Sequence, residues 1–132
     1  MSSVLVDFTR MWEDAHKASV TEPAHVKAAF LLSVIGPRIA AAALGLSDAR
    51  QLKRWSAGET EPREHHVAVR LDALYWIVRA VEGCYSPSVA ARFLRSANPQ
   101  LDDEAPLVVL ASAENPDVIR RVLVSTRAFL EG

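Results

Sequence analysis

The segment from Ile39 to Gly58, IAAAALGLSDARQLKRWSAG, has the pattern of two short helices joined by a tight turn. Gly45 ends an apolar, alanine-rich run and is expected to take the left-handed backbone conformation that terminates a helix. Leu46 is expected to be buried in the corner between the two helices. Ser47 or Asp48 would cap the second helix by accepting hydrogen bonds from its free backbone amides.

The second of these helices has one apolar side and one basic side. Leu52 and Trp55 are three residues apart and therefore share a helix face, which we expect to be buried. The polar residues that are left to face outward are Arg50, Gln51, Lys53 and Arg54. A basic helix held by its apolar side against a small scaffold is what a helix-turn-helix presents to the major groove of DNA. A helical hairpin that never touches DNA shows the same pattern, so this segment alone leaves both interpretations open.

The rest of the chain also has helical periodicity, so we predict an all-α fold with three parts. Residues 1–22 form an amphipathic N-terminal helix, residues 23–84 a helix-turn-helix DNA-binding-like domain, and residues 85–132 a small C-terminal helical domain. The apolar stripe of the first helix includes Trp12 and must therefore pack against other apolar surface. That surface is either the core of its own chain or a second copy of the chain.

Proline, glycine, serine and asparagine mark the other predicted helix ends. Pro62 is expected to open a long helix that runs to about Glu82 and is closed by Gly83. Ser86 is expected to cap the following helix, and Asn115 the last helix.

Composition limits the classes of partner and the cellular compartment. The formal net charge is −1, which argues against a generally basic, nucleic-acid-coating protein, so any DNA contact must come from a local patch. Residues 36–70 hold six Lys/Arg against four Asp/Glu, a net of +2, whereas residues 98–132 hold three against six, a net of −3. Cys84 is the single cysteine, which excludes an intrachain disulfide. Without a signal peptide or a membrane-spanning run we expect a cytoplasmic protein that makes no membrane contact.

The sequence contains no motif that predicts catalysis. It has no glycine-rich phosphate loop, no cysteine pair and no His-Glu pair at metal-ligand spacing. His65 and His66 are adjacent and would point about 100° apart on a helix, and no further ligand follows at zinc-site spacing. We therefore expect no enzyme activity, no metal site and no cofactor, and we expect both histidines to face solvent.

Two stretches resemble the Xre/MbcA/ParS-type antitoxins, which pair a helix-turn-helix with a helical toxin-binding domain. The first is GLSDARQLKRWSAG at residues 45–58, similar to the family's turn and Arg-rich helix ending Arg-Trp-x-x-Gly. The second is NPQL at residues 98–101 followed by PLVVL at residues 106–110. The resemblance covers about residues 26–132, and the order of the two motifs along the chain agrees with that in the family.

The resemblance implies a protein partner and a DNA partner. The protein would be a toxin of the Arg-Glu-Ser (RES) class, which consumes NAD, and the C-terminal domain would neutralise it by covering its active-site cleft. The DNA would be the operator of the antitoxin's own operon. The assembly would be a homodimer or a hetero-oligomer with the toxin.

Site residues follow from the motifs and from the exposed positions around them. The predicted DNA-binding residues are Arg38, Arg50, Gln51, Lys53, Arg54 and Arg63. The predicted toxin-binding residues are Asn98, Pro99, Leu101, Pro106, Leu107, Arg120, Arg127, Glu131 and Gly132. Within the second set, we expect the prolines and leucines to build the fold, and the groups of the last helix and tail to make the contact. Two alternatives stay open: a stand-alone transcription regulator and a purely protein-binding helical module.

Overall fold

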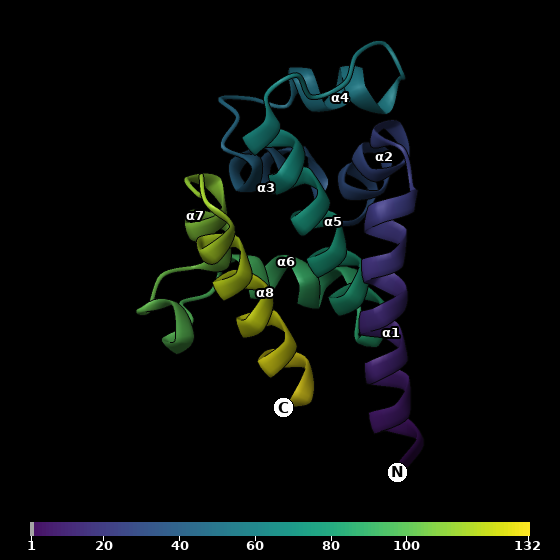
Figure 1. Cartoon of the computed structure of the whole chain (residues 1–132), viewed down its shortest axis with the longest axis vertical. Coiled ribbons are helices and arrows are strands. Elements are labelled where there is room, and N and C mark those ends of the chain that lie inside the picture. Colours follow the sequence, from purple (N-terminus) through teal and green to yellow (C-terminus); the bar gives the residue numbers. More distant parts are fainter. Residues whose placement is uncertain (1) are drawn as a thin grey trace.

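The computed structural model describes residues 2–132, and the side chains from Phe8 onward, as an assembly of helices (Figure 1). Within this range no residue belongs to a β-strand, so the predicted all-α fold class is confirmed. The elements in chain order are α1 (Ser2–Thr21), α2 (Ala24–Val34), α3 (Gly36–Leu44), α4 (Arg50–Ser56), α5 (His65–Cys84), α6 (Pro87–Arg95), the 3₁₀ helix η1 (Pro99–Leu101), α7 (Pro106–Ala111) and α8 (Pro116–Glu131).

Helix α5 is the centre of the structure. It packs against α1, α2, α3, α6, α7 and α8. Most of its circumference is buried, since the successive residues Ala73, Leu74 and Tyr75 point about 100° apart and are all buried. The hydrophobic core around it is one continuous cluster, to which each of the eight α-helices contributes. The cluster therefore includes residues on both sides of residues 84 and 85, where the sequence predicts a domain boundary.

Helix α1 packs mainly along α5 (Figure 1). Phe8, Trp12 and Ala15 on its apolar stripe are buried, and the indole N–H of Trp76 donates a hydrogen bond to the backbone carbonyl of Trp12 at 3.2 Å. The sequence left open whether this stripe packs in the core of its own chain or on a second copy, and in the structure it packs in the core of its own chain.

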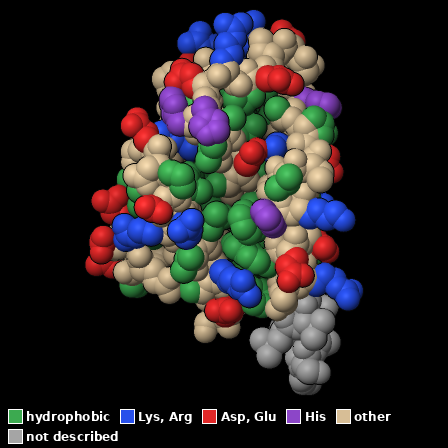
Figure 2. Space-filling view, in the orientation of Figure 1, with side chains coloured by type: hydrophobic (Ala, Val, Ile, Leu, Met, Phe, Trp, Pro, Cys, Tyr) green, Lys and Arg blue, Asp and Glu red, His purple; other side chains and the backbone are tan. Residues whose placement is uncertain are grey.

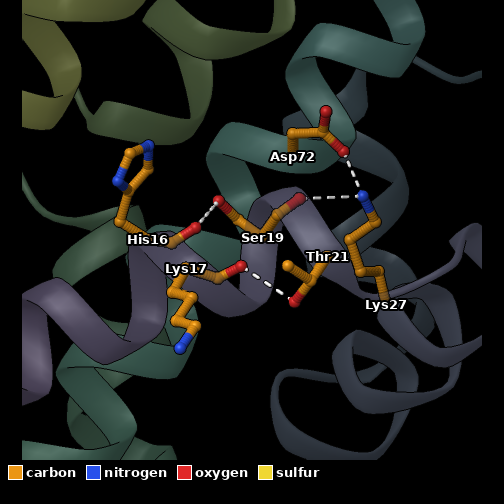
Figure 3. Close-up of polar contacts among 6 residues, drawn as sticks. All are labelled: His16, Lys17, Ser19, Thr21, Lys27 and Asp72. Carbon is orange, nitrogen blue, oxygen red and sulfur yellow. Dashed lines mark hydrogen bonds and ion pairs between the residues drawn. The ribbon is translucent and has the colours of Figure 1, made fainter.

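Lysine 27 fastens the end of α1 to α2 and α5 (Figure 3). Its ammonium group donates to the backbone carbonyl of Ser19 at 3.1 Å and to the carboxylate of Asp72 on α5. A buried cation is tolerated when its charge is paired and its protons are donated. The three helices thereby form one scaffold, and α4 packs on the α2 part of it.

Local capping signals place several helix ends correctly. The hydroxyl of Ser86 accepts a hydrogen bond from the backbone N–H of Val89 at 3.2 Å, and the side chain of Asn115 accepts one from Val118 at 3.0 Å. Both predicted caps are therefore confirmed.

The predicted ends of the long helix are wrong. α5 begins at His65 rather than at Pro62, because residues 60–64 form a loop that lies beside α4. Gly83 does not close α5, which continues to Cys84. A Cβ atom on Gly83 would lie 2.5 Å from the sulfur of Met11, so the glycine lets α1 approach α5 closely.

Candidate functional site

The turn between α3 and α4 is built on a glycine. Gly45 has φ 76° and ψ 22°, the left-handed conformation predicted for it, and glycine adopts that conformation at little cost. A Cβ atom at this position would also lie 2.5 Å from the backbone oxygen of Ala111, so the turn packs directly on the end of α7. Leu46 is only partly buried, less than the sequence predicts.

Helix α4 turns its two apolar residues inward and its polar residues outward, as predicted. Leu52 and Trp55 are buried in the core cluster, and the residues exposed to solvent are Arg50, Gln51, Lys53 and Arg54. Figure 2 shows Lys and Arg side chains gathered at the end of the molecule where α4 lies. This end carries the local concentration of positive charge that an acidic chain needs to approach a polyanion.

The loop before α5 completes this surface. Arg63 lies with Gln51 and Arg54 around a shallow hollow of about 290 Å³, which Glu61 and Glu64 also line. Arg38 is exposed on the first turn of α3 and does not line this hollow. The structure therefore groups three of the six predicted DNA-binding residues around one hollow.

Aspartate 48 organises the start of α4. Its carboxylate accepts hydrogen bonds from the backbone N–H of Arg50 at 2.9 Å, from Nε of Arg50 at 3.0 Å and from Nη2 at 2.7 Å. The side-chain hydrogen bonds of Arg50, followed by its backbone N–H, hold the pKa of the Asp48 carboxyl below its usual value. The carboxylate in turn raises the pKa of the Arg50 guanidinium. The N-cap residue of α4 is Ala49, whose side chain makes no capping hydrogen bond, so the predicted side-chain cap is replaced by the bond that Asp48 accepts from the first backbone N–H of the helix. The ion pair of Asp48 with Arg50 is not evident from the sequence.

The predicted toxin-binding residues divide into two structural groups. Leu101 and Pro106 are buried, and the side chain of Asn98 accepts a hydrogen bond from the backbone N–H of Gln100 at 2.9 Å. These residues hold the turn between α6 and α7, together with Leu107, which is partly buried, and Pro99, which is exposed. The expectation that the prolines and leucines build this part of the fold is therefore met by Leu101 and Pro106 but not by the exposed Pro99.

The second group is exposed on α8 and at Gly132. Arg120 lies 3.6 Å from the carboxylate of Asp117, and Arg127 lies 3.8 Å from that of Glu131. Exposed pairs of this kind contribute little to stability, so these arginines can exchange their partners readily.

An apolar groove of about 500 Å³ lies between α1, α5 and α8, and Figure 2 shows its hydrophobic side chains near the centre of the view. The residues that line it are Trp12, His65, His66, Val69, Trp76, Ala113, Glu114, Asn115, Pro116, Ile119, Arg120, Leu123, Val124 and Arg127. In the wall formed by α1 and α5, the centroid of the Trp76 ring lies 4.2 Å from that of His16 and 4.8 Å from that of Trp12.

Sequence reasoning missed this groove, although α8 carries a signal for it. Arg120, Val124 and Arg127 recur at four- and three-residue spacing and therefore share a helix face. Val124 is 58 % exposed, which gives this face an apolar residue outside the buried stripe. His65 is exposed as predicted, whereas His66 is only partly exposed and lies 3.1 Å from the carboxylate of Glu64.

Arginine 70 joins the turn before α4 to the wall of the groove. It is buried, and its guanidinium donates to the backbone carbonyl of Leu44 at 3.2 Å and to that of Ala113 at 3.0 Å. Leu44 ends α3, and Ala113 lines the groove. The sequence signal was an arginine on the apolar stripe of α5, three residues after Val67 and four before Leu74.

Among the residues that the structure describes, no group of histidine, cysteine or carboxylate side chains could hold a metal ion. Over residues 2–132 no helix combines the length and the apolar character of a membrane span. Comparison of the chain with protein families, curated proteins and solved structures found no match.

Proposed function

We propose that this chain is the antitoxin of a toxin-antitoxin pair, which neutralises an NAD-consuming RES-domain toxin and represses its own operon through a helix-turn-helix. The observation that carries the proposal is that the two motifs that resemble those of the Xre/MbcA/ParS-type antitoxins lead to two separate exposed surfaces. The first motif exposes the basic side of α4, and the second leads into α8, whose outer side borders the apolar groove.

The orientation of α4 supports the DNA-binding part of the proposal. Arg50, Gln51 and Arg54 are exposed and would read base edges, because arginine and glutamine make bidentate contacts with bases in the major groove. Phosphate contacts would come from Arg38, Lys53 and Arg63, which are also exposed. Such contacts fix the register of a protein on the duplex without reading its sequence.

The groove beside α8 supports the toxin-binding part. Val124 exposes a large apolar side chain there, and exposed apolar patches with polar rims commonly mark protein-binding surfaces. Arg120 and Arg127 stand at its edge and can pair with carboxylates of a toxin, because their present partners are exposed and weakly held. A stable complex buries about 1,200–2,000 Å² in total. To reach that area, a partner in the groove would also have to contact the neighbouring surface of α1 and α8.

A fluorescence-anisotropy titration tests the DNA-binding part. The protein, with and without toxin, is titrated against the region upstream of its own gene and against random duplex at low salt. We expect preference for the upstream region, and we expect an Arg50→Ala/Arg54→Ala protein to lose that preference. Equal affinity of the wild type for both duplexes would remove the regulator role.

Growth of cells that express the toxin tests the other part. Val124→Asp is expected to abolish rescue, because it places a carboxylate on the apolar groove. Val108→Asp is the matched control, since Val108 is 49 % exposed on α7 and does not line the groove. The Arg50→Ala/Arg54→Ala protein should still rescue growth. Rescue by Val124→Asp together with loss of rescue by Val108→Asp would move the interface to α7, and DNA binding without any rescue would favour a stand-alone regulator.

A further inference from the structure

The first residue of α4 is an exposed arginine whose guanidinium is held in place. The side chain of Arg50 is 87 % exposed, and that of Asp48 is 45 % exposed. Nε and Nη2 of Arg50 both donate to one carboxylate oxygen of Asp48, while the other oxygen accepts the backbone N–H of the same arginine. One carboxylate thus accepts hydrogen bonds from both the first backbone N–H and the first side chain of the helix.

The remaining hydrogen-bond donors of Arg50 define what it can bind. A guanidinium has five N–H donors, and Asp48 uses the Nε–Nη2 side. The outer edge, formed by Nη1 and the second proton of Nη2, stays available. Two parallel donors on one edge match the O6 and N7 acceptors that guanine presents in the major groove.

The same carboxylate disfavours the competing use of Arg50. A phosphate would bring its negative charge close to that of Asp48, whereas a guanine edge carries no net charge. Holding the guanidinium also lowers the conformational entropy that the side chain would lose on binding. Asp48 therefore weakens sequence-independent contact and favours contact with a base.

We propose that Asp48 is a specificity-determining positioning residue, which holds Arg50 for a bidentate contact with one guanine of the DNA site. The inference rests on the proposed DNA-binding function. It adds the base class that Arg50 reads and a residue that acts through Arg50 without touching the base itself.

The test compares wild type with Asp48→Asn on the upstream duplex and on duplexes in which single guanines are replaced by 7-deazaguanine, which lacks the N7 acceptor. For wild type we expect one guanine whose replacement weakens binding about tenfold or more. Asp48→Asn should retain the hydrogen bond from the backbone N–H of Arg50, because the asparagine side chain also offers an oxygen acceptor, but its amide carries no charge to hold the guanidinium. We expect it to lose most of the discrimination at that guanine while binding random duplex as tightly as wild type or more tightly.

Three controls separate the outcomes. Asp117→Asn removes an exposed aspartate that pairs with Arg120 on α8 and should leave discrimination unchanged. In an Arg50→Ala background, Asp48→Asn should have no further effect on discrimination, and circular dichroism should show that each variant is folded. Undiminished discrimination by a folded Asp48→Asn protein would overturn this inference and leave the proposed function intact. A wild type with no preference for the upstream duplex would overturn both.

Discussion

At the scale of single residues, Asp48 is an exposed group with a defined electrostatic environment. The guanidinium of Arg50 and then its backbone N–H lower the pKa of the Asp48 carboxyl. A carboxyl whose pKa is lower in the folded protein stabilises the fold above its ordinary pKa, and this stabilisation is lost as the pH falls through the folded value.

We therefore expect NMR titration to give the Asp48 carboxyl a pKa below the ordinary aspartate value of about 3.9. In Arg50→Ala protein, the pKa of Asp48 should rise toward that value, because the largest cause of the shift has been removed. The urea midpoints of the two proteins should converge as the pH falls through the interval between the two values. Arg54→Ala removes a cation from α4 that makes no contact with Asp48, so the titration should then stay nearly as in wild type. If the pKa of Asp48 rose as much in Arg54→Ala as in Arg50→Ala, the general positive charge of α4 and not the contact with Arg50 would be its cause.

At the scale of elements, the close packing of the α3–α4 turn against α7 can be measured with two glycines. Gly45 and Gly58 have almost the same positive φ, 76° and 77°. A Cβ atom on Gly45 would lie 2.5 Å from the backbone oxygen of Ala111, whereas one on Gly58 would have nothing within 4 Å.

Gly58→Ala should therefore lower the free energy of unfolding by about 1–2 kcal/mol, the cost of a left-handed L-residue. Gly45→Ala should lower it by more, because the same conformational cost is combined with a collision against backbone. Urea denaturation of both variants gives the comparison. Equal losses would show that the turn can move away from α7 at no cost.

The helix ends also show which features the sequence could predict. Gly45, Ser86 and Asn115 act through hydrogen bonds or backbone conformation within a few residues, so their roles can be inferred locally. The role of Gly83 depends on how closely α1 approaches α5, and that distance is set by the packing of distant segments. The groove was missed for the same reason: it exists only where three helices meet.

For the candidate site, too, the sequence predicts local features but not contacts between distant segments, and the buried cations are the example. The exposed positions of α4 could be predicted from the spacing of Leu52 and Trp55, because they follow from helix geometry alone. Lys27 and Arg70 occupy apolar helix faces, and their acceptors lie on other elements: the carboxylate of Asp72 and the backbone oxygens of Ser19, Leu44 and Ala113. No local pattern identifies such acceptors.

At the scale of the whole molecule, Arg70 joins the end of α3 to the segment between α7 and α8. We expect Arg70→Met to lower the free energy of unfolding by about 1–3 kcal/mol, because two buried carbonyl oxygens then lose their donor. Arg10→Met, on the exposed side of α1, is the matched control and should stay within about 0.5 kcal/mol of wild type. Chemical denaturation at neutral pH, followed by circular dichroism, gives both values. Equal stability of the two variants would show that water replaces the guanidinium at both oxygens.

The contacts of Arg70 also limit how such a chain can diversify. Substitutions on the outer side of α4 change exposed residues only, so the chemistry of this surface could change by point mutation without disturbing the core. The C-terminal half is different, since α5 and Arg70 connect it to α3. Recombination that joined residues 85–132 to an unrelated N-terminal unit would leave Ala113 without its donor and one side of α8 without its packing surface. We therefore expect the surface of this half to change in place, while its contacts with α3 and α5 stay as they are.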